Sequence, residues 1–236
     1  MRAFSFALLL TVLCLALSAA SFAADDATLY VVQGVPGRDV SATVNPGLPV
    51  DVLLNNEVCS FRGLTFPGNS GPLTLPAGSY DIKVSPANSL LPCSNPPEAE
   101  TTVKLAAGGA TTVALALSNG APTLLTFADN LKTVPAGSGR LTIANATDAG
   151  TLQLTLAQSG VKNPKTRTFS LNSGQEITLQ VPAELYTLQV TANGSTTPIF
   201  VGIVGAGSHS VELVYLVGSA GNNSVTLIDR IIRDVF

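Results

Sequence analysis

The sequence contains few side chains that could carry out chemistry. Its one histidine in 236 residues is His209, with Ser208 and Ser210 on either side. A catalytic triad needs the serine hydroxyl beside the imidazole, but successive residues of a strand point to opposite faces. We therefore expect His209 to be an exposed turn residue rather than a catalytic base.

The carboxylates are scattered, and no motif frames a pair of them. Glycoside hydrolysis needs two carboxyl groups held about 5–10 Å apart in a cleft. Calcium loops and glycine-rich phosphate loops are absent from the sequence. The sequence therefore predicts a protein that is not an enzyme, with no catalytic residue, no metal site and no cofactor. The acidic residues considered for such roles are Asp25, Asp26, Asp51, Glu57 and Asp81.

Two of the three cysteines are expected to form a disulfide. Cys14 lies in the apolar N-terminal segment, which leaves Cys59 and Cys93 in the remainder of the chain. Two cysteines in an exported protein favour one bridge, and two buried thiols are the alternative. No Cys-x-x-Cys redox motif is present.

The first two dozen residues have the pattern of a signal peptide. Arg2 is followed by an apolar run from Phe4 to Leu17, and Ser21-Phe22-Ala23 supplies small residues at the −3 and −1 positions. The run is shorter than the roughly 20 residues that span a bilayer. We expect cleavage between Ala23 and Ala24 and export to the periplasm, the extracellular space or the cell surface.

Composition excludes two classes of partner. The formal net charge is −3 and charged residues make up 11% of the chain. Acidic and basic residues are interspersed, with no basic stripe, which argues against nucleic acid and anionic membrane surfaces. No second apolar run reaches spanning length, so we expect no transmembrane segment after signal removal.

Strand patterns dominate the rest of the chain. Residues 80–84 alternate apolar and polar side chains, and residues 113–117 place large side chains on one face and alanines on the other. Residues 49–54 lead into Asn55-Asn56, a pair that suits a tight hairpin. Gly108-Gly109 is interpreted as a second hairpin. The end, residues 228–235, could be a short helix or a last strand.

The sequence repeats itself. Leu75-Pro-Ala-Gly-Ser-Tyr-Asp-Ile-Lys-Val84 is echoed 106 residues later by Val181-Pro-Ala-Glu-Leu-Tyr-Thr-Leu-Gln-Val190. Residues 107–115 are echoed by 205–213 at a spacing of 98, so the first copy has eight extra residues, and Cys93 lies in that segment. The bridge would fasten this loop to the strand after the Asn55-Asn56 hairpin.

Each copy has about seven expected strands, with turn signals every 8–12 residues. The sequence therefore predicts an all-β protein of two tandem antiparallel β-sandwich domains, immunoglobulin-like or transthyretin-like, after a signal peptide. The expected divisions are a signal peptide 1–23, a first domain 24–127, a linker 128–139 and a second domain 140–236.

The repeated tyrosines, Tyr80 and Tyr186, have two interpretations. Each would bury its ring and return its hydroxyl to a nearby backbone group, as in a tyrosine corner. Stacking on a sugar is the alternative. The alternation that follows each tyrosine places it on the apolar face, which favours the structural role.

Three motifs in order resemble a known family. They are Tyr30-Val-Val-Gln-Gly-Val-Pro-Gly37, Pro49-Val-Asp-Val-Leu-Leu-Asn55 and Gly71-Pro-Leu-Thr-Leu-Pro-Ala-Gly-Ser-Tyr80. Residues 28–127 are similar to the bacterial domain of unknown function numbered 4397, and residues 135–148 resemble the start of another copy. That second copy is divergent, since it lacks Val-Asp-Val and has Glu184 in place of Gly78. The resemblance implies an exported bacterial β-sandwich, often in tandem, with no catalytic residues.

Two functions remain in view. The first is an exported, non-catalytic protein of the cell envelope or extracellular space that acts by surface interaction or as a structural module. The alternative is a small-ligand or glycan-binding protein. The expected partner is thus an unidentified envelope protein or a glycan.

Overall fold

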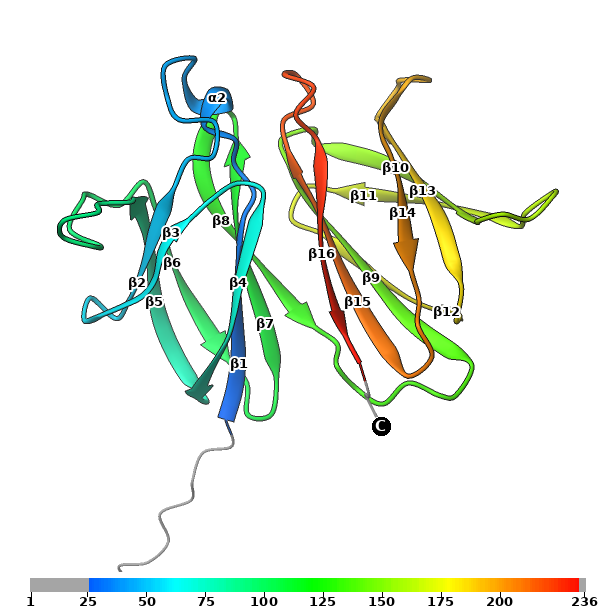
Figure 1. Cartoon of the computed structure of the whole chain (residues 1–236), viewed down its shortest axis with the longest axis horizontal. Helices are drawn as coiled ribbons and strands as arrows, with labels where there is room; N and C mark the ends of the chain where they lie inside the picture. The colour runs from blue at the N-terminus through cyan, green and yellow to red at the C-terminus, as the bar shows by residue number, and fades with distance from the viewer. Residues whose placement is uncertain (1–25, 234–236) are drawn as a thin grey trace, which may run out of the picture.

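The computed structural model describes residues 26–233, which form sixteen strands and one short helix, α2 (Gly37–Val40). Figure 1 shows two β-sandwiches standing side by side, each with an inner sheet toward the other and an outer sheet away from it. The expected cleavage residues Ala23 and Ala24, together with Asp25, lie outside the described residues. Within residues 26–233, no helix has the length and hydropathy that a membrane crossing requires.

The first domain has an inner sheet of order β4-β1-β7-β8 and an outer sheet of order β3-β2-β5-β6. Its strands are β1 Asp26–Gln33, β2 Val50–Leu54, β3 Val58–Leu64, β4 Gly68–Pro76, β5 Gly78–Pro86, β6 Ala99–Leu105, β7 Ala110–Ser118 and β8 Ala121–Asp129.

The second domain repeats this topology strand for strand. Its inner sheet has the order β12-β9-β15-β16 and its outer sheet the order β11-β10-β13-β14. Its strands are β9 Ser138–Thr147, β10 Thr151–Gln158, β11 Thr166–Asn172, β12 Glu176–Pro182, β13 Leu185–Ala192, β14 Pro198–Gly205, β15 Ser210–Gly218 and β16 Thr226–Ile232.

The expected pair of β-sandwich domains is confirmed, with corrections of detail. Each domain has eight strands rather than about seven. An immunoglobulin constant-type sandwich has seven strands ordered A-B-E-D and C-F-G, so the eight-stranded transthyretin-like alternative fits better. One pair in each inner sheet is parallel, β1 with β7 and β9 with β15. These strands can be parallel because the chain passes through the outer sheet between them.

Three local expectations are settled by the strands. The prediction of a hairpin at Gly108-Gly109 is wrong. β6 pairs with β5 in the outer sheet, whereas β7 pairs with β1 and β8 in the inner sheet. The glycines therefore turn the chain from one sheet to the other. The Asn55-Asn56 hairpin is confirmed, with φ of 50° and 59° between β2 and β3. Of the segment 228–235, residues 228–232 lie in strand β16 rather than in a helix, and residues 234–235 lie outside the described residues.

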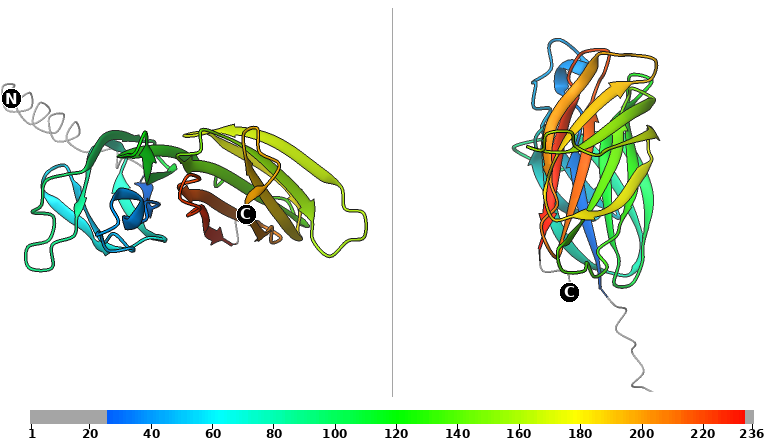
Figure 2. Two further views of the ribbon diagram at one scale, coloured as in Figure 1. Left: turned by 90° about the horizontal axis from the view of Figure 1, so that it is seen from above. Right: turned by 90° about the vertical axis from the view of Figure 1, so that its right-hand side faces the viewer.

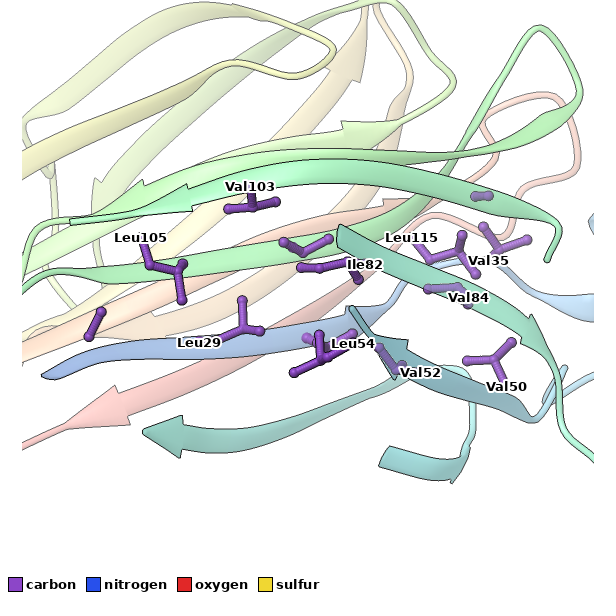
Figure 3. Close-up of a cluster of buried hydrophobic side chains, with 14 of the residues drawn as sticks. Leu29, Val35, Val50, Val52, Leu54, Ile82, Val84, Val103, Leu105 and Leu115 are labelled. Atoms are coloured by element: carbon purple, nitrogen blue, oxygen red, sulfur yellow. The ribbon is translucent and has the colours of Figure 1, made fainter. Parts of the chain in front are cut away.

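Each sandwich has its own apolar core. The first includes Leu29, Val52, Ile82, Val103 and Leu115, which project between the two sheets in Figure 3. The second is built from the equivalent strands around Ile143, Leu154, Leu188, Val190 and Leu216. Full burial of such side chains contributes about 1.5–3 kcal/mol each to folding.

A third apolar cluster joins the two domains. β7 and β15 are buried along nearly their whole length on both faces, because each inner sheet packs its second face on the other. Figure 2 shows the two sandwiches adjoining along these sheets. Small residues line part of the contact and allow the sheets to approach closely. The buried members are Val32, Ala114, Ala116, Phe127, Val134, Ala144, Ala146, Val211, Leu213, Tyr215, Val217 and Ile228.

We expect the two domains to unfold as one unit because this cluster belongs to both. Leu213→Ala, in the shared cluster, and Leu154→Ala, in the second core, should each lower stability by about 2–5 kcal/mol. In the Leu154→Ala protein, calorimetry should show one transition at lower temperature for the whole molecule. Two separate transitions, with the first domain melting as in the unaltered protein, would contradict a shared core.

Candidate functional site

His209 lies in the turn before β15, where its φ is 54°. It is half-buried rather than exposed, because its ring Nδ1 hydrogen-bonds with Val134 O at 2.9 Å. Its backbone N–H donates to Ser138 O, and the neighbouring Ser208 Oγ accepts from Gly137 N. Both residues thus hold the segment between β8 and β9 against the second domain.

The candidate carboxylates are not brought together. Asp81 and Glu57 are exposed on the outer sheet and its hairpin, and Asp26 is exposed at the start of β1. Asp81 accepts a hydrogen bond from Thr102 Oγ1 at 2.7 Å. Within residues 26–233, no three or more histidine, cysteine or acidic side chains are grouped so that they could hold a metal ion.

Asp51 is the exception, since its carboxylate is buried and organises a loop. Oδ2 accepts from the backbone N–H groups of Cys93 (2.9 Å) and Asn88 (3.1 Å), and Oδ1 accepts from that of Gly63 (2.9 Å). Burial alone would raise the pKa of Asp51, but these three donors and nearby Arg62 outweigh it, so the pKa lies below its usual value. The carboxylate is therefore a structural anion.

The loop that Asp51 holds, residues 87–98 between β5 and β6, lies where the first copy has its extra residues. The Cys59–Cys93 disulfide, with a Cα–Cα distance of 5.8 Å, ties it to β3. Asn95 Nδ2 donates to Pro86 O, and Asn88 Oδ1 accepts from the backbone N–H of Leu91. The predicted bridge is thus confirmed, and it fastens the predicted loop. We call residues 87–98 the clamped loop.

The clamped loop presents apolar side chains to solvent. Leu90 is 93% exposed and Leu91 is 64% exposed, although both lie within a few residues of the disulfide and of the Asp51 contacts. Large apolar side chains held in the open by several constraints mark a candidate contact surface. The sequence contained these residues, but without the fold nothing indicated that they would be exposed.

The tyrosine-corner interpretation is confirmed in both domains. Tyr80 donates its hydroxyl to Pro76 O at 2.8 Å, and Tyr186 donates to Pro182 O at 3.0 Å. The Tyr186 ring is buried in the second core, and the Tyr80 ring packs against the first. Tyr186 is only 7% exposed and thus closed to sugar stacking, whereas Tyr80 is partly buried.

A buried polar cluster crosses the interface between the domains. Asp129, at the end of β8, accepts from Thr112 Oγ1 at 2.8 Å and from the Tyr215 hydroxyl at 3.0 Å. The two hydroxyl oxygens are themselves 2.6 Å apart. Three contacts need three protons, and the hydroxyls supply two of them. The ring closes when Asp129 is protonated, because its own O–H then donates to one of the two hydroxyls instead of accepting from it.

Burial favours the protonated form of three carboxyls in the inner sheets. Burial raises the pKa of Asp129 to about 6, against the opposing effect of its two hydroxyl partners. Burial, with the nearby charge of Asp129, raises the pKa of Glu176 to about 7, and its Oε2 has no hydrogen-bond partner among the described residues. Burial likewise raises the pKa of Glu212 to about 7. Perturbed carboxyls can mark an active site, but Asp129 is buried between the two inner sheets, and Glu212 is buried and accepts from Gly205 N within the second domain.

Polar contacts also close the rims of the interface. Arg230 of β16 donates to Asn69 Oδ1 and Ser70 O of β4, each at 2.7 Å, and lies over the Tyr30 ring at 4.2 Å. At the other end Asp39, in α2, accepts from Asn222 Nδ2 and Ser224 Oγ. These bonds join strands and loops that are more than 150 residues apart in the sequence.

A hollow in the surface lies at the α2 end of the interface. It is an open cleft of about 570 Å³. The residues that line the cleft include the apolar ring of Phe66 and the charged side chain of Arg38. Its lining comprises Pro36, Arg38, Asp39, Pro46, Gly47, Phe66, Pro67, Asn222 and Ser224.

Together these features define an all-β protein of two sandwich domains fused through their inner sheets, with a clamped loop on the outer sheet of the first. The chain belongs to the family described as "Domain of unknown function (DUF4397)", which matches residues 27–155. The match begins in β1 and extends into β10 of the second domain. No curated protein matches the sequence.

The chain also matches several solved structures at low sequence identity and low TM-score. One is a Bacteroides ovatus ATCC 8483 protein whose name proposes cell adhesion, 9% identical with a TM-score of 0.29, covering 87% of this chain and 97% of that one. A Bacteroides uniformis ATCC 8492 protein with a similar name is 13% identical with a TM-score of 0.27, covering 89% and 99%. The Bacillus anthracis TIE protein is 15% identical with a TM-score of 0.26, covering 81% of this chain and 33% of that one.

Loss of the disulfide should destabilise the first domain. Opening a bridge with a sequence separation of 34 costs roughly 3–4 kcal/mol on the chain-entropy argument. Cys59→Ser/Cys93→Ser should therefore lower the free energy of unfolding by that amount in urea titrations. The double substitution should also increase the rate of amide exchange in residues 87–98 by more than it does in the β10–β11 loop. Unchanged exchange in the clamped loop would mean that Asp51 alone fixes it.

Stability should fall as pH rises from about 4 to about 7. Asp129, Glu176 and Glu212 have raised pKa values in the folded protein, so they stay protonated there while the unfolded chain ionises. Asp129→Asn can close the same ring with its amide, and should remove the share of the slope between about pH 4 and 6. Urea titrations across that range test this, with the exposed Glu57→Gln as control. A full slope in Asp129→Asn would refute the assigned proton.

Proposed function

We propose that this protein is an exported, non-catalytic β-sandwich protein of the cell envelope or extracellular space that acts by surface interaction through its clamped loop. The observation that carries the proposal is the exposure of Leu90 and Leu91 on a loop held by a disulfide and a buried carboxylate. A loop already fixed in one conformation loses little entropy when it binds. The partner is an envelope protein or glycan, and two exposed leucines favour an apolar protein surface over a sugar.

Export is supported by two features of the chain. The N-terminal segment has the pattern of a signal peptide with cleavage between Ala23 and Ala24, and the Cys59–Cys93 disulfide suits an oxidising compartment. The proposed mature protein consists of a first domain 24–127, a linker 128–139 and a second domain 140–236. The shared strand order and the paired tyrosine corners support two tandem family copies, the second divergent.

A small-ligand or glycan-binding role is the second candidate, and the cleft at the α2 end of the interface favours it. Arg38 and Phe66 would provide a charge and an aromatic face. However, Asp39 is already bonded to Asn222 and Ser224 across the cleft, which leaves fewer polar groups for a ligand. Glycan-array binding that is lost in Phe66→Ala and retained in Leu90→Ser would favour this candidate.

The leading proposal predicts a specific neighbour at the clamped loop. A photo-crosslinking residue at position 90, in the protein expressed in its native host, should give a discrete adduct in the envelope or extracellular fraction. The same residue at position 161, in the β10–β11 loop and also apolar and exposed, is the matched control. Leu91→Ser should weaken the adduct from position 90 without changing the melting temperature, because Leu91 is mostly in solvent.

Two results would overturn the proposal. Equal adducts from positions 90 and 161, or none from either, would show that the clamped loop is not the contact surface. Recovery of the protein from the cytoplasm with an intact N-terminus would contradict export.

A further inference from the structure

β14 is an edge strand of the second domain's outer sheet, with β13 on one side and no strand on the other (Figure 1). It has the sequence Pro-Ile-Phe-Val-Gly-Ile-Val-Gly, with no charged side chain, and only Val204 of its eight residues is buried. Uncharged, apolar edge strands readily pair with another chain, and most proteins protect them with charges or bulges.

The equivalent edge of the first domain carries that protection. Tyr80 pairs with Val103 as Tyr186 pairs with Val204, which aligns β6 with β14. Glu100 and Thr102 of β6 thus correspond to Val201 and Ile203 of β14. Glu100 is ion-paired with Lys83 at 3.5 Å, and Thr102 donates to Asp81. The same edge is polar in one domain and apolar in the other, where Val201 is 59% exposed and Ile203 is 55% exposed.

The backbone of β14 directs specific groups outward. Ala206 N donates to Glu184 O, so the even-numbered residues of this strand face β13. The odd-numbered residues therefore direct their N–H and C=O groups to the free edge. Gly205 N is already bonded to Glu212 Oε2 at 2.9 Å. The backbone groups of Val201 and Ile203 remain directed outward.

The geometry points to a second copy of this chain as the partner, with two β14 strands paired antiparallel about a two-fold axis at Gly202. In that register Val201 lies opposite Ile203 of the second copy, and Ile203 opposite its Val201. Both positions direct their backbone groups outward, so each facing pair would exchange two N–H···O bonds. Because the strand carries no charge, two identical edges meet without like-charge repulsion. The outer sheets would then form one continuous sheet.

The expected association is weak. Pairing two edge strands buries far less than the roughly 1,600 Å² of a standard interface. Dimers should therefore form at high local concentration, as on a surface or in a secreted assembly. The surface lies on the second domain, away from the clamped loop of the first, so the inference does not depend on the proposed function.

Sedimentation equilibrium of the mature chain from about 1 µM to about 1 mM tests the inference. We expect a reversible monomer–dimer equilibrium. Ile203→Pro keeps the β13–β14 ladder, because the lost N–H faces the free edge, but removes two of the new hydrogen bonds and should raise the dissociation constant at least about tenfold. Thr102→Pro, at the equivalent position of β6, is the matched control and should dimerise like the unaltered protein. A monomer throughout, or a dimer insensitive to Ile203→Pro, would overturn the inference.

Disulfide trapping tests the register without relying on proline. The Cα atoms of a hydrogen-bonded antiparallel pair lie about 5.5 Å apart, within reach of a disulfide. Mixed Val201→Cys and Ile203→Cys proteins should form a mixed crosslinked dimer on mild oxidation, faster than either variant alone. Equal or no crosslinking in the mixture would contradict pairing centred on Gly202.

Discussion

The packing of two inner β-sheets against each other is the constraint on which the rest of this structure depends. A sandwich normally buries one face of each sheet and leaves the other in water. Here β7 and β15 are buried on both faces, so each inner sheet belongs to a domain core and to the shared cluster at once. The polar groups on the second face must then find partners without water, as Thr112, Asp129 and Tyr215 do in their closed ring.

This arrangement separates structural from interactive parts of the molecule. Asp129, His209 and the tyrosine-corner hydroxyls all form hydrogen bonds within the fold. Burial accounts for the raised pKa of Asp129. The outer sheets lie away from the interface, and their surfaces differ between the two domains. The first displays a loop that a disulfide and Asp51 hold in place, and the second displays an apolar edge strand.

Much of the fold could be predicted from the sequence because its signals are local. Alternation in residues 80–84, the Asn55-Asn56 turn and the repeated tyrosine motif each depend on near neighbours. The prediction of a hairpin at Gly108-Gly109 was wrong because glycines suit a turn between two sheets as well as a turn within one sheet. The alternation of Val113, Leu115 and Leu117 with alanines indicated two unlike faces. However, only the fold shows that Ala114 and Ala116 face another domain. The polar ring depends on pairing Thr112 with a tyrosine 103 residues away, which no local pattern indicates.

A double-mutant cycle between Thr112→Val and Tyr215→Phe measures the link between the domains most directly, since one residue comes from each inner sheet. If the buried ring joins the two sandwiches into one body, the coupling free energy of unfolding should be about 1 kcal/mol or more, as for residues within one hydrogen-bond network. Additive effects of the two substitutions, with no coupling beyond about 0.3 kcal/mol, would contradict the account of the buried ring as a link between the two inner sheets.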